Sequence, residues 1–183
     1  MDKNQLEPYL LFARKYHTNP DPAHDFRHIQ RIVKRLDVLA EGFAPLNYSL
    51  LYFLACFHGL RKKINEDKRV HEEVIDFLTD LGWTKQEITE GLISLARHLE
   101  NPGTPEEKIV HDANYLELLG AFGIAKAFTT GGFRGQTYEE TIAVYESQYL
   151  EKIKFQTPQG KVLAEEGRDY ARKFLERLKN ELR

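Results

Sequence analysis

The sequence predicts an all-α protein that folds as a single domain, residues 1–183, with about eight helices. Two observations predict this class. Apolar residues recur at helical spacing along most of the chain, and no stretch alternates apolar and polar residues for long enough to form a strand. A third observation places the core, because residues 50–59 form a nearly unbroken apolar run. Such a run is typical of a helix that is buried on all sides.

The helices that precede and include this run have clear boundaries in the sequence. The first is predicted over residues 5–16, and the prolines at 20 and 22 end it because proline cannot continue a helix. The second is predicted over about residues 23–41, where apolar positions repeat with helical spacing. The central helix is predicted over 47–58, and Asn47 is a suitable N-cap.

The remaining helices follow from start and stop signals. Capping boxes of the form Thr-x-x-Glu at 84–87 and 104–107 predict two helix starts. The glycine-rich residues 129–135 are expected to form a turn after a short helix. These helices are expected at about residues 70–81, 84–99, 104–119, 120–128, 138–152 and 157–182. The last is expected to bury Val162, Tyr170, Phe174, Leu178 and Leu182.

Composition restricts the function classes. The chain is 42% hydrophobic and 30% charged with a net charge of −2, which gives no general attraction to nucleic acid. No apolar run approaches the roughly 20 residues of a membrane span, and the N-terminus does not resemble a secretion signal. A single cysteine, Cys56, lies in the buried run and cannot form an internal disulfide. We therefore expect a cytoplasmic protein.

Three residues with metal-binding chemistry lie on or beside the apolar faces of three helices: His28, His58 and Asp112. A buried carboxylate must be paired, protonated or bound to a metal, and a buried imidazole also needs partners. If the three side chains converge, two imidazoles and a carboxylate suit a divalent transition metal with open positions for water or substrate. The alternative is that each histidine is a hydrogen-bonded core residue.

Three segments resemble the HD superfamily of all-α, metal-dependent phosphohydrolases. They are His-Asp-x-x-His-x-x-Arg-Ile at 24–32, the histidine that closes the apolar helix at position 58, and Ile-Val-x-Asp-Ala-x-x-Leu-x-x-Leu-Gly-Ala-x-Gly-Ile-Ala at 109–125. The sequence is most similar to the small bacterial, stand-alone HD-domain hydrolases. The resemblance covers residues 20–178, including the opening of the last helix at 157–161.

This resemblance implies roles for individual residues. A divalent ion (Mn, Fe, Zn, Mg or Ni) is bound by His28, His58 and Asp112, and His98 lies near the substrate as the catalytic candidate. The candidates for substrate binding are His24 and Arg31 in the first motif and Arg61 and Lys62 in the basic stretch after His58. These last two cations also suit the C-terminal end of a helix dipole, which is an equally good explanation of their position.

The sequence departs from the family pattern at the chemistry itself. Gly59 stands where the family has the aspartate of its His-Asp pair, which ordinarily binds the metal. Asn114 and Tyr115 stand where Asp-Ala-Asp-Arg has its second aspartate and its arginine. Gly59 also has a structural explanation, as a left-handed residue that ends a helix.

Two hypotheses follow from this departure. The first, which we favour slightly, is hydrolysis of a phosphate ester or anhydride, with a nucleotide as the expected partner, by metal-activated water and with impairment at Gly59. The second is a catalytically inactive module of the same fold that binds a ligand or a protein. The sequence does not decide whether the protein is an enzyme.

Overall fold

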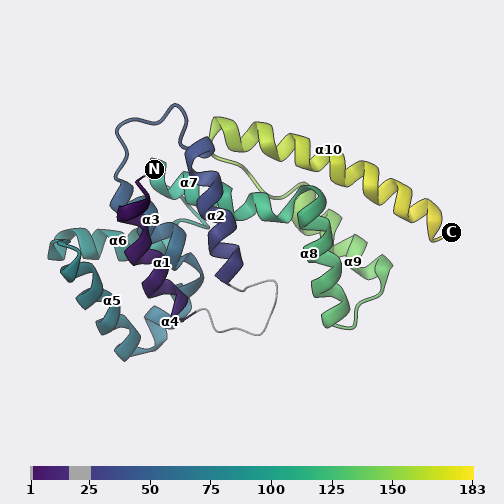
Figure 1. Cartoon of the computed structure of the whole chain (residues 1–183). Helices are drawn as coiled ribbons and strands as arrows, with labels where there is room; N and C mark the ends of the chain where they lie inside the picture. The colour runs from purple at the N-terminus through teal and green to yellow at the C-terminus, as the bar shows by residue number, and fades with distance from the viewer. Residues whose placement is uncertain (1, 17–25) are drawn as a thin grey trace.

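The structure, a computed structural model, describes residues 2–16 and 26–183, and these ranges contain helices and no strand. The predicted all-α class is therefore confirmed. Figure 1 shows the helices as a body around α3, from which α8, α9 and α10 extend as an arm. The helices are α1 (Lys3–Arg14), α2 (Phe26–Leu39), α3 (Tyr48–Phe57), α4 (Arg61–Glu66), α5 (Lys68–Asp80), α6 (Lys85–Arg97), α7 (Pro105–Tyr115), α8 (Gly120–Phe133), α9 (Tyr138–Tyr145) and α10 (Pro158–Glu181).

The central helix α3 is buried as its composition predicts. Asn47 caps it, and its side-chain oxygen accepts a hydrogen bond from the backbone N–H of Leu50 at 3.1 Å. Every residue from 51 to 57 is fully buried, and α1, α2, α6 and α7 all contact α3. A buried leucine or phenylalanine side chain contributes about 1.5–3 kcal/mol, so this helix is a main source of stability.

The helix starts read from Thr-x-x-Glu patterns are confirmed. Capping boxes are present at Thr84 and Thr104, where each threonine accepts a hydrogen bond from the glutamate N–H three residues later. α7 follows Thr104 and contacts α2 and α10 as well as α3. It is therefore surrounded on several sides, and side chains on more than one of its faces are buried.

The glycine-rich segment differs from its prediction. α8 continues to Phe133 instead of ending near residue 128. Gly135, two residues after the last helical residue, has a φ of 73° in the left-handed region, a conformation that terminates helices. Gly131 is helical and buried, and a Cβ at this position would collide with the hydroxyl of Thr141. Glycine here permits close packing of α9 against α8, and it does not form a turn.

The helix α10 begins at the predicted place but buries a different face. Thr157 is its N-cap and Pro158 its first residue. Val162 and Tyr170, which we expected to be buried, are 55% and 51% exposed. The residues that α10 buries are Gly160, Ala164, Ala171 and Leu175. Phe174 and Leu182 are exposed as well, whereas Leu178 is partly buried against the core. Most of the predicted face is exposed because α10 lies along the outside of the arm, where only a narrow strip is covered.

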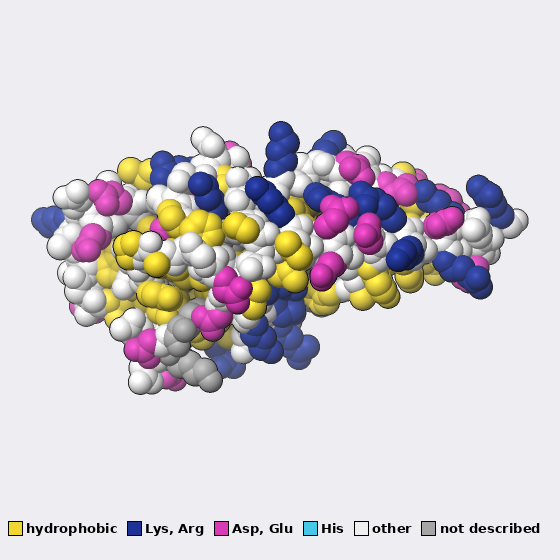
Figure 2. All heavy atoms as spheres, turned by 90° about the horizontal axis from the view of Figure 1, so that it is seen from above, with side chains coloured by type: hydrophobic (Ala, Val, Ile, Leu, Met, Phe, Trp, Pro, Cys, Tyr) yellow, Lys and Arg dark blue, Asp and Glu magenta, His cyan; other side chains and the backbone are white. Residues whose placement is uncertain are grey.

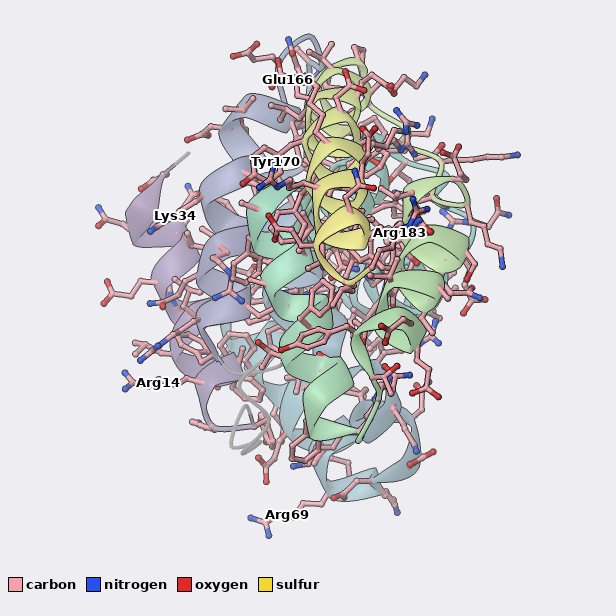
Figure 3. All side chains as sticks on the ribbon, turned by 90° about the vertical axis from the view of Figure 1, so that its right-hand side faces the viewer. Arg14, Lys34, Arg69, Glu166, Tyr170 and Arg183 are labelled. Carbon is pink, nitrogen blue, oxygen red and sulfur yellow. The ribbon has the colours of Figure 1, made fainter. Side chains whose placement is uncertain are left out.

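Figures 2 and 3 show the surface of this arm. Seen from above, cationic and anionic side chains are mixed along its length in Figure 2. Figure 3 looks toward the free end of α10, with Glu166, Tyr170 and Arg183 labelled along it. Among the described residues, no helix combines the length and the apolar character needed to cross a membrane.

Candidate functional site

The side chains of the histidines at 28 and 58 meet in the structure. His28 lies in the first turn of α2, and His58 follows α3 in a short 3-10 turn, η1 (His58–Leu60). Their Nε2 atoms are 2.9 Å apart, and the side chains are almost fully buried. Two elements distant in sequence therefore present two imidazoles to one point.

Glu117 forms a hydrogen bond with one member of this pair, His28. It is fully buried in the 3-10 turn η2 (Leu116–Leu118) after α7, and its carboxylate accepts hydrogen bonds from His28 Nδ1 at 2.7 Å and from Arg31 Nε at 2.6 Å. Arg35 and Lys126 lie 3.3 and 3.8 Å from the same carboxylate. Burial alone would raise the pKa of Glu117, but the hydrogen bonds from His28 and Arg31 hold the pKa at about 2. Glu117 is therefore ionised and its charge is compensated.

The hydrogen bonds fix one proton on each ring of the pair. Glu117 is ionised, so Nδ1 of His28 donates to it. The backbone oxygen of Ala55 can only accept, so Nδ1 of His58, at 3.0 Å from it, also donates. A hydrogen bond between the two Nε2 atoms then needs one further proton. Burial lowers the pKa of His28, which favours its neutral form.

A pocket of about 500 Å³ opens beside the pair. Lys63 and Lys126 bring two cations to it, and the described residues of its lining include no aspartate or glutamate. The Nζ of Lys63 lies 5.1 Å from the centre of the Tyr16 ring. The lining consists of Tyr16, His28, His58, Gly59, Leu60, Lys63, Leu99, Asn114, Leu118 and Lys126. The pocket therefore combines positive charge with an apolar wall.

Asp112 is not part of this pocket, which corrects the expected set of three ligands. Its carboxylate oxygens accept hydrogen bonds from the backbone N–H groups of Gln156 and Thr157 at 2.7–3.0 Å, and from the Thr157 hydroxyl at 2.8 Å. Nδ1 of His111 lies 2.8 Å from it as well. A Cβ at Gly160 would collide with the same carboxylate. Asp112 thus joins α7 to the start of α10, and its buried charge is satisfied by that junction.

The position on α7 that does line the pocket is Asn114. It is two residues after Asp112, and two residues rotate the side chain by about 200° around a helix. In the resembling pattern Asp-Ala-Asp-Arg this is the second aspartate, and Gly59 replaces the other expected acid. Both pocket positions that the pattern reserves for carboxylates therefore carry uncharged residues here.

The backbone dihedral at Gly59 does not require glycine. Gly59 lies inside η1, and its φ is not positive. The prediction that it ends a helix in the left-handed conformation is therefore wrong, because a φ in this range is accessible to any L-residue.

His98, the catalytic candidate, is fully buried behind the pocket. Its Nδ1 donates to the backbone oxygen of Leu95 at 2.9 Å, and its ring centre is 6.4 Å from that of His58. No described residue provides a hydrogen-bond partner for its Nε2. Burial lowers the pKa of His98 to about 4, so the ring is neutral near pH 7.

The four candidates for substrate binding lie in different surroundings. Arg31 binds Glu117, and its guanidinium lies 4.5 Å from the ring centre of Phe122. Arg61 donates to the backbone oxygen of Ala96 at 2.7 Å, and Lys62 is exposed, 4.0 Å from Glu66. Neither Arg61 nor Lys62 lines the pocket. The remaining candidate, His24, lies outside the described residues.

The donor set does not fit the metal that the fold implies. A divalent transition metal in a protein generally needs three or more protein ligands, and His28 and His58 supply two. Glu117 and Asp112 use their oxygens in hydrogen bonds to other groups of the chain. In residues 2–16 and 26–183, no group of three His, Cys, Asp or Glu side chains is arranged to hold a metal ion.

Two residues of the pocket and its support, Glu117 and Lys126, were not singled out from the sequence. Glu117 lies between the apolar Leu116 and Leu118, and an acid within such a stretch is the signal that could have identified it. Lys63 belongs to the basic stretch after His58 that the sequence suggests for phosphate binding, whereas Lys126 lies on α8, where charged residues at a helix surface are common. Only the packing of distant helices reveals that these two lysines share a pocket.

The comparisons with known proteins concern the fold. No family model matches the sequence. The fold is that of a crystallised HD-superfamily hydrolase from Bacillus thuringiensis, with a TM-score of 0.79 and 24% identity over 98% of this chain and 97% of that one. The chain therefore has an HD-like helical fold, as the resemblance implied.

Individual relatives can also be named. The chain is 23% identical over 193 aligned residues to the uncharacterized protein YpgQ of Bacillus subtilis (strain 168). The alignment covers 97% of this chain and 94% of YpgQ. The crystal structure of YpgQ in complex with ADP has a TM-score of 0.78 and 21% identity, with 97% and 95% of the two chains covered. A Listeria innocua protein has a TM-score of 0.79 and 22% identity, with 100% and 98% covered.

Proposed function

We propose that the protein binds the phosphate-bearing part of a small molecule, and specifically a nucleotide, in the pocket beside His28 and His58. The observation that carries this proposal is the lining, which brings Lys63 and Lys126 together with the imidazoles of His28 and His58. Phosphate oxygens are bound by such cationic and N–H donors. The ADP complex of YpgQ supports a nucleotide as the ligand class.

Size and shape support the same class. A volume of about 500 Å³ is within the usual range for small-molecule pockets, and one wall is apolar. Leu60, Leu99 and the ring of Tyr16 provide a surface for the uncharged part of the ligand. The negative charge of Glu117 does not oppose the phosphate because Arg31 and Arg35 compensate it.

Each polar residue then has a stated task. Lys126 and Lys63 bind phosphate oxygens, and the Asn114 side-chain amide donates a further hydrogen bond. Glu117 holds the ring of His28 in position through Nδ1. Asp112 acts only through the fold, because it fixes the start of α10.

Hydrolysis of the bound phosphate ester or anhydride is the second candidate function. It is favoured by the closeness of the two Nε2 atoms, 2.9 Å apart, while both Nδ1 atoms lie against acceptors, an orientation common in metal-binding histidines. It requires a further ligand that the described residues do not supply. Binding without turnover is therefore the better supported function.

Calorimetric titration with ADP tests the binding proposal. In Lys126→Met the charge is removed and the length of the side chain is nearly kept, so we expect affinity to fall about tenfold or more, the effect of one charge-assisted hydrogen bond. Lys62→Met is the matched control, because Lys62 is exposed and outside the pocket. Equal affinity of both variants, or no binding of any of ADP, ATP or pyrophosphate by the native protein, contradicts the proposal. A hydrolysis assay with Mn²⁺ on the same samples tests the second candidate.

A further inference from the structure

We propose that α10 is the contact surface between two copies of this chain, which associate as an antiparallel dimer with two-fold symmetry and with Tyr170 near the symmetry axis. This inference concerns the arm and not the pocket, so it does not depend on the proposed function. It follows from the apolar side chains that α10 exposes, from the place of this helix in the molecule and from two charges that match each other in the antiparallel orientation.

The helix α10 exposes large apolar side chains along much of its length. Val162, Tyr170 and Phe174 are 55%, 51% and 39% exposed. They are spaced by eight and four residues, and each residue turns a helix by about 100°, so the three side chains lie on one broad face. Single exposed apolar residues are common on protein surfaces, whereas a row of them along one helix marks an interaction surface.

The place of α10 leaves room for a second copy. Figure 1 shows it along the upper edge of the molecule, with its first turn at the body and its last turn at the free end of the arm, and Figure 2 shows apolar side chains along one edge of this arm. In an antiparallel dimer, the body of each copy lies beyond the free end of the other copy's helix. The two bodies therefore stay apart while the helices pair.

The length of the helix sets the size of this contact. α10 has 24 residues and is therefore about 36 Å long. A contact between two helices of this length lies at the small end of specific interfaces, which indicates a reversible dimer. Two-fold symmetry is the commonest arrangement for two identical chains, and it requires a face that is complementary to itself.

Two exposed charges make the face of α10 self-complementary in one direction. Glu166 and Lys173 are seven residues apart, so they lie two turns apart on the same flank of the helix, with Tyr170 between them. When two copies run antiparallel about Tyr170, Glu166 of each copy faces Lys173 of the other, which forms two ion pairs. In a parallel dimer these charges are offset by about 10 Å along the helix axis.

Other cations in this half of α10 are already paired within the chain. They are Arg172 with Glu151, Arg177 with Glu181, and Lys179 with Glu146. Charges that flank an apolar helix seam determine which orientation two helices adopt. We therefore assign the choice of orientation to Glu166 and Lys173, and the contact itself to the apolar row.

Sedimentation velocity of the native full chain over a range of concentrations tests the dimer. We expect a reversible equilibrium between monomer and dimer, with a Kd on the order of 10 μM. Tyr170→Ala removes the central apolar side chain and should raise the Kd about tenfold or more. A native chain that stays monomeric up to about 300 μM, or a Tyr170→Ala variant with the native Kd, overturns the inference.

Charge reversal tests the antiparallel orientation. Glu166→Lys and Lys173→Glu each convert two attractive pairs into two repulsive ones, so we expect the Kd to rise about tenfold in either variant. The double variant restores both pairs with reversed signs and should return to the native Kd. Asp76→Lys makes the same change of charge as Glu166→Lys at an exposed position of α5, and it should leave the Kd unchanged. A double variant that dissociates as readily as the single variants overturns the proposed arrangement.

Discussion

Two positions on different sides of α7, Asp112 and Asn114, differ in what they contact. At Asp112, the carboxylate is surrounded by hydrogen-bond donors from Gln156, Thr157 and His111, all from the chain itself. At Asn114, the side chain faces a pocket with two lysines and two imidazoles. The first region is satisfied by groups of the chain itself, whereas the second borders a pocket of about 500 Å³. Burial of an acid at Asp112 therefore reflects a structural junction.

The largest effect is expected at this junction. Asp112→Ala removes the acceptor for Gln156 and Thr157 and leaves buried N–H groups without partners. We expect a loss of about 4 kcal/mol in the free energy of unfolding, measured in urea. Asp76→Ala, at an exposed position of α5, is the control. A variant that keeps its stability but loses ligand binding would contradict the assignment of Asp112 to the junction between α7 and α10.

The next effect concerns the buried histidine behind the pocket. Burial lowers the pKa of His98 from 6.5 to about 4, so the folded state holds the ring neutral while the unfolded state takes up a proton. This contribution to stability is complete above pH 6.5 and is lost as the pH falls through about 4, with a magnitude of about 3 kcal/mol.

Urea unfolding at several pH values in this window measures the loss. In His98→Phe the titrating group is absent, so the decline toward low pH should be shallower than in the native protein. An unchanged slope in that variant would assign the acid sensitivity to other groups, and His98 would then be accessible to protons in the folded state and not sealed behind the pocket.

A smaller effect is expected where α10 begins. Gly160→Ala would place a methyl group against the Asp112 carboxylate and the Thr157 hydroxyl, so the junction must shift. We expect a loss of about 2 kcal/mol in the free energy of unfolding. Gly132→Ala is the matched control, since a Cβ there meets nothing within 4 Å and alanine is the better helix former. Equal stabilities of the two variants would show that the junction is looser than its hydrogen bonds indicate.

Much of the fold could be predicted because its signals are local. The capping boxes at Thr84 and Thr104 and the N-cap at Thr157 are recognisable from residues within one turn of each helix start. The burial of α3 followed from its composition alone. The role of Gly131 was predicted wrongly because its cause is non-local: it allows α9 to approach α8.

The site was predicted in part, for a related reason. Helical spacing showed correctly that Asp112 is buried. However, α7 contacts both α2 and α10, so a buried side chain on α7 can face either of these helices. His28 and His58 were found because each ends or begins an apolar helix surface. Lys126 lacks any such local signal, and its proximity to Lys63 depends on how α4 and α8 are packed.

The anchoring of α10 at one end has a consequence for its amide protons. Its first turn is tied to Asp112, whereas the last residue that it buries is Leu175, and beyond that Lys179 is held to Glu146 at the surface. The free end projects past the body of the molecule in Figure 1. Hydrogen–deuterium exchange along this helix should therefore be slow near Gly160 and become progressively faster toward Arg183, because the end that lacks buried contacts opens first.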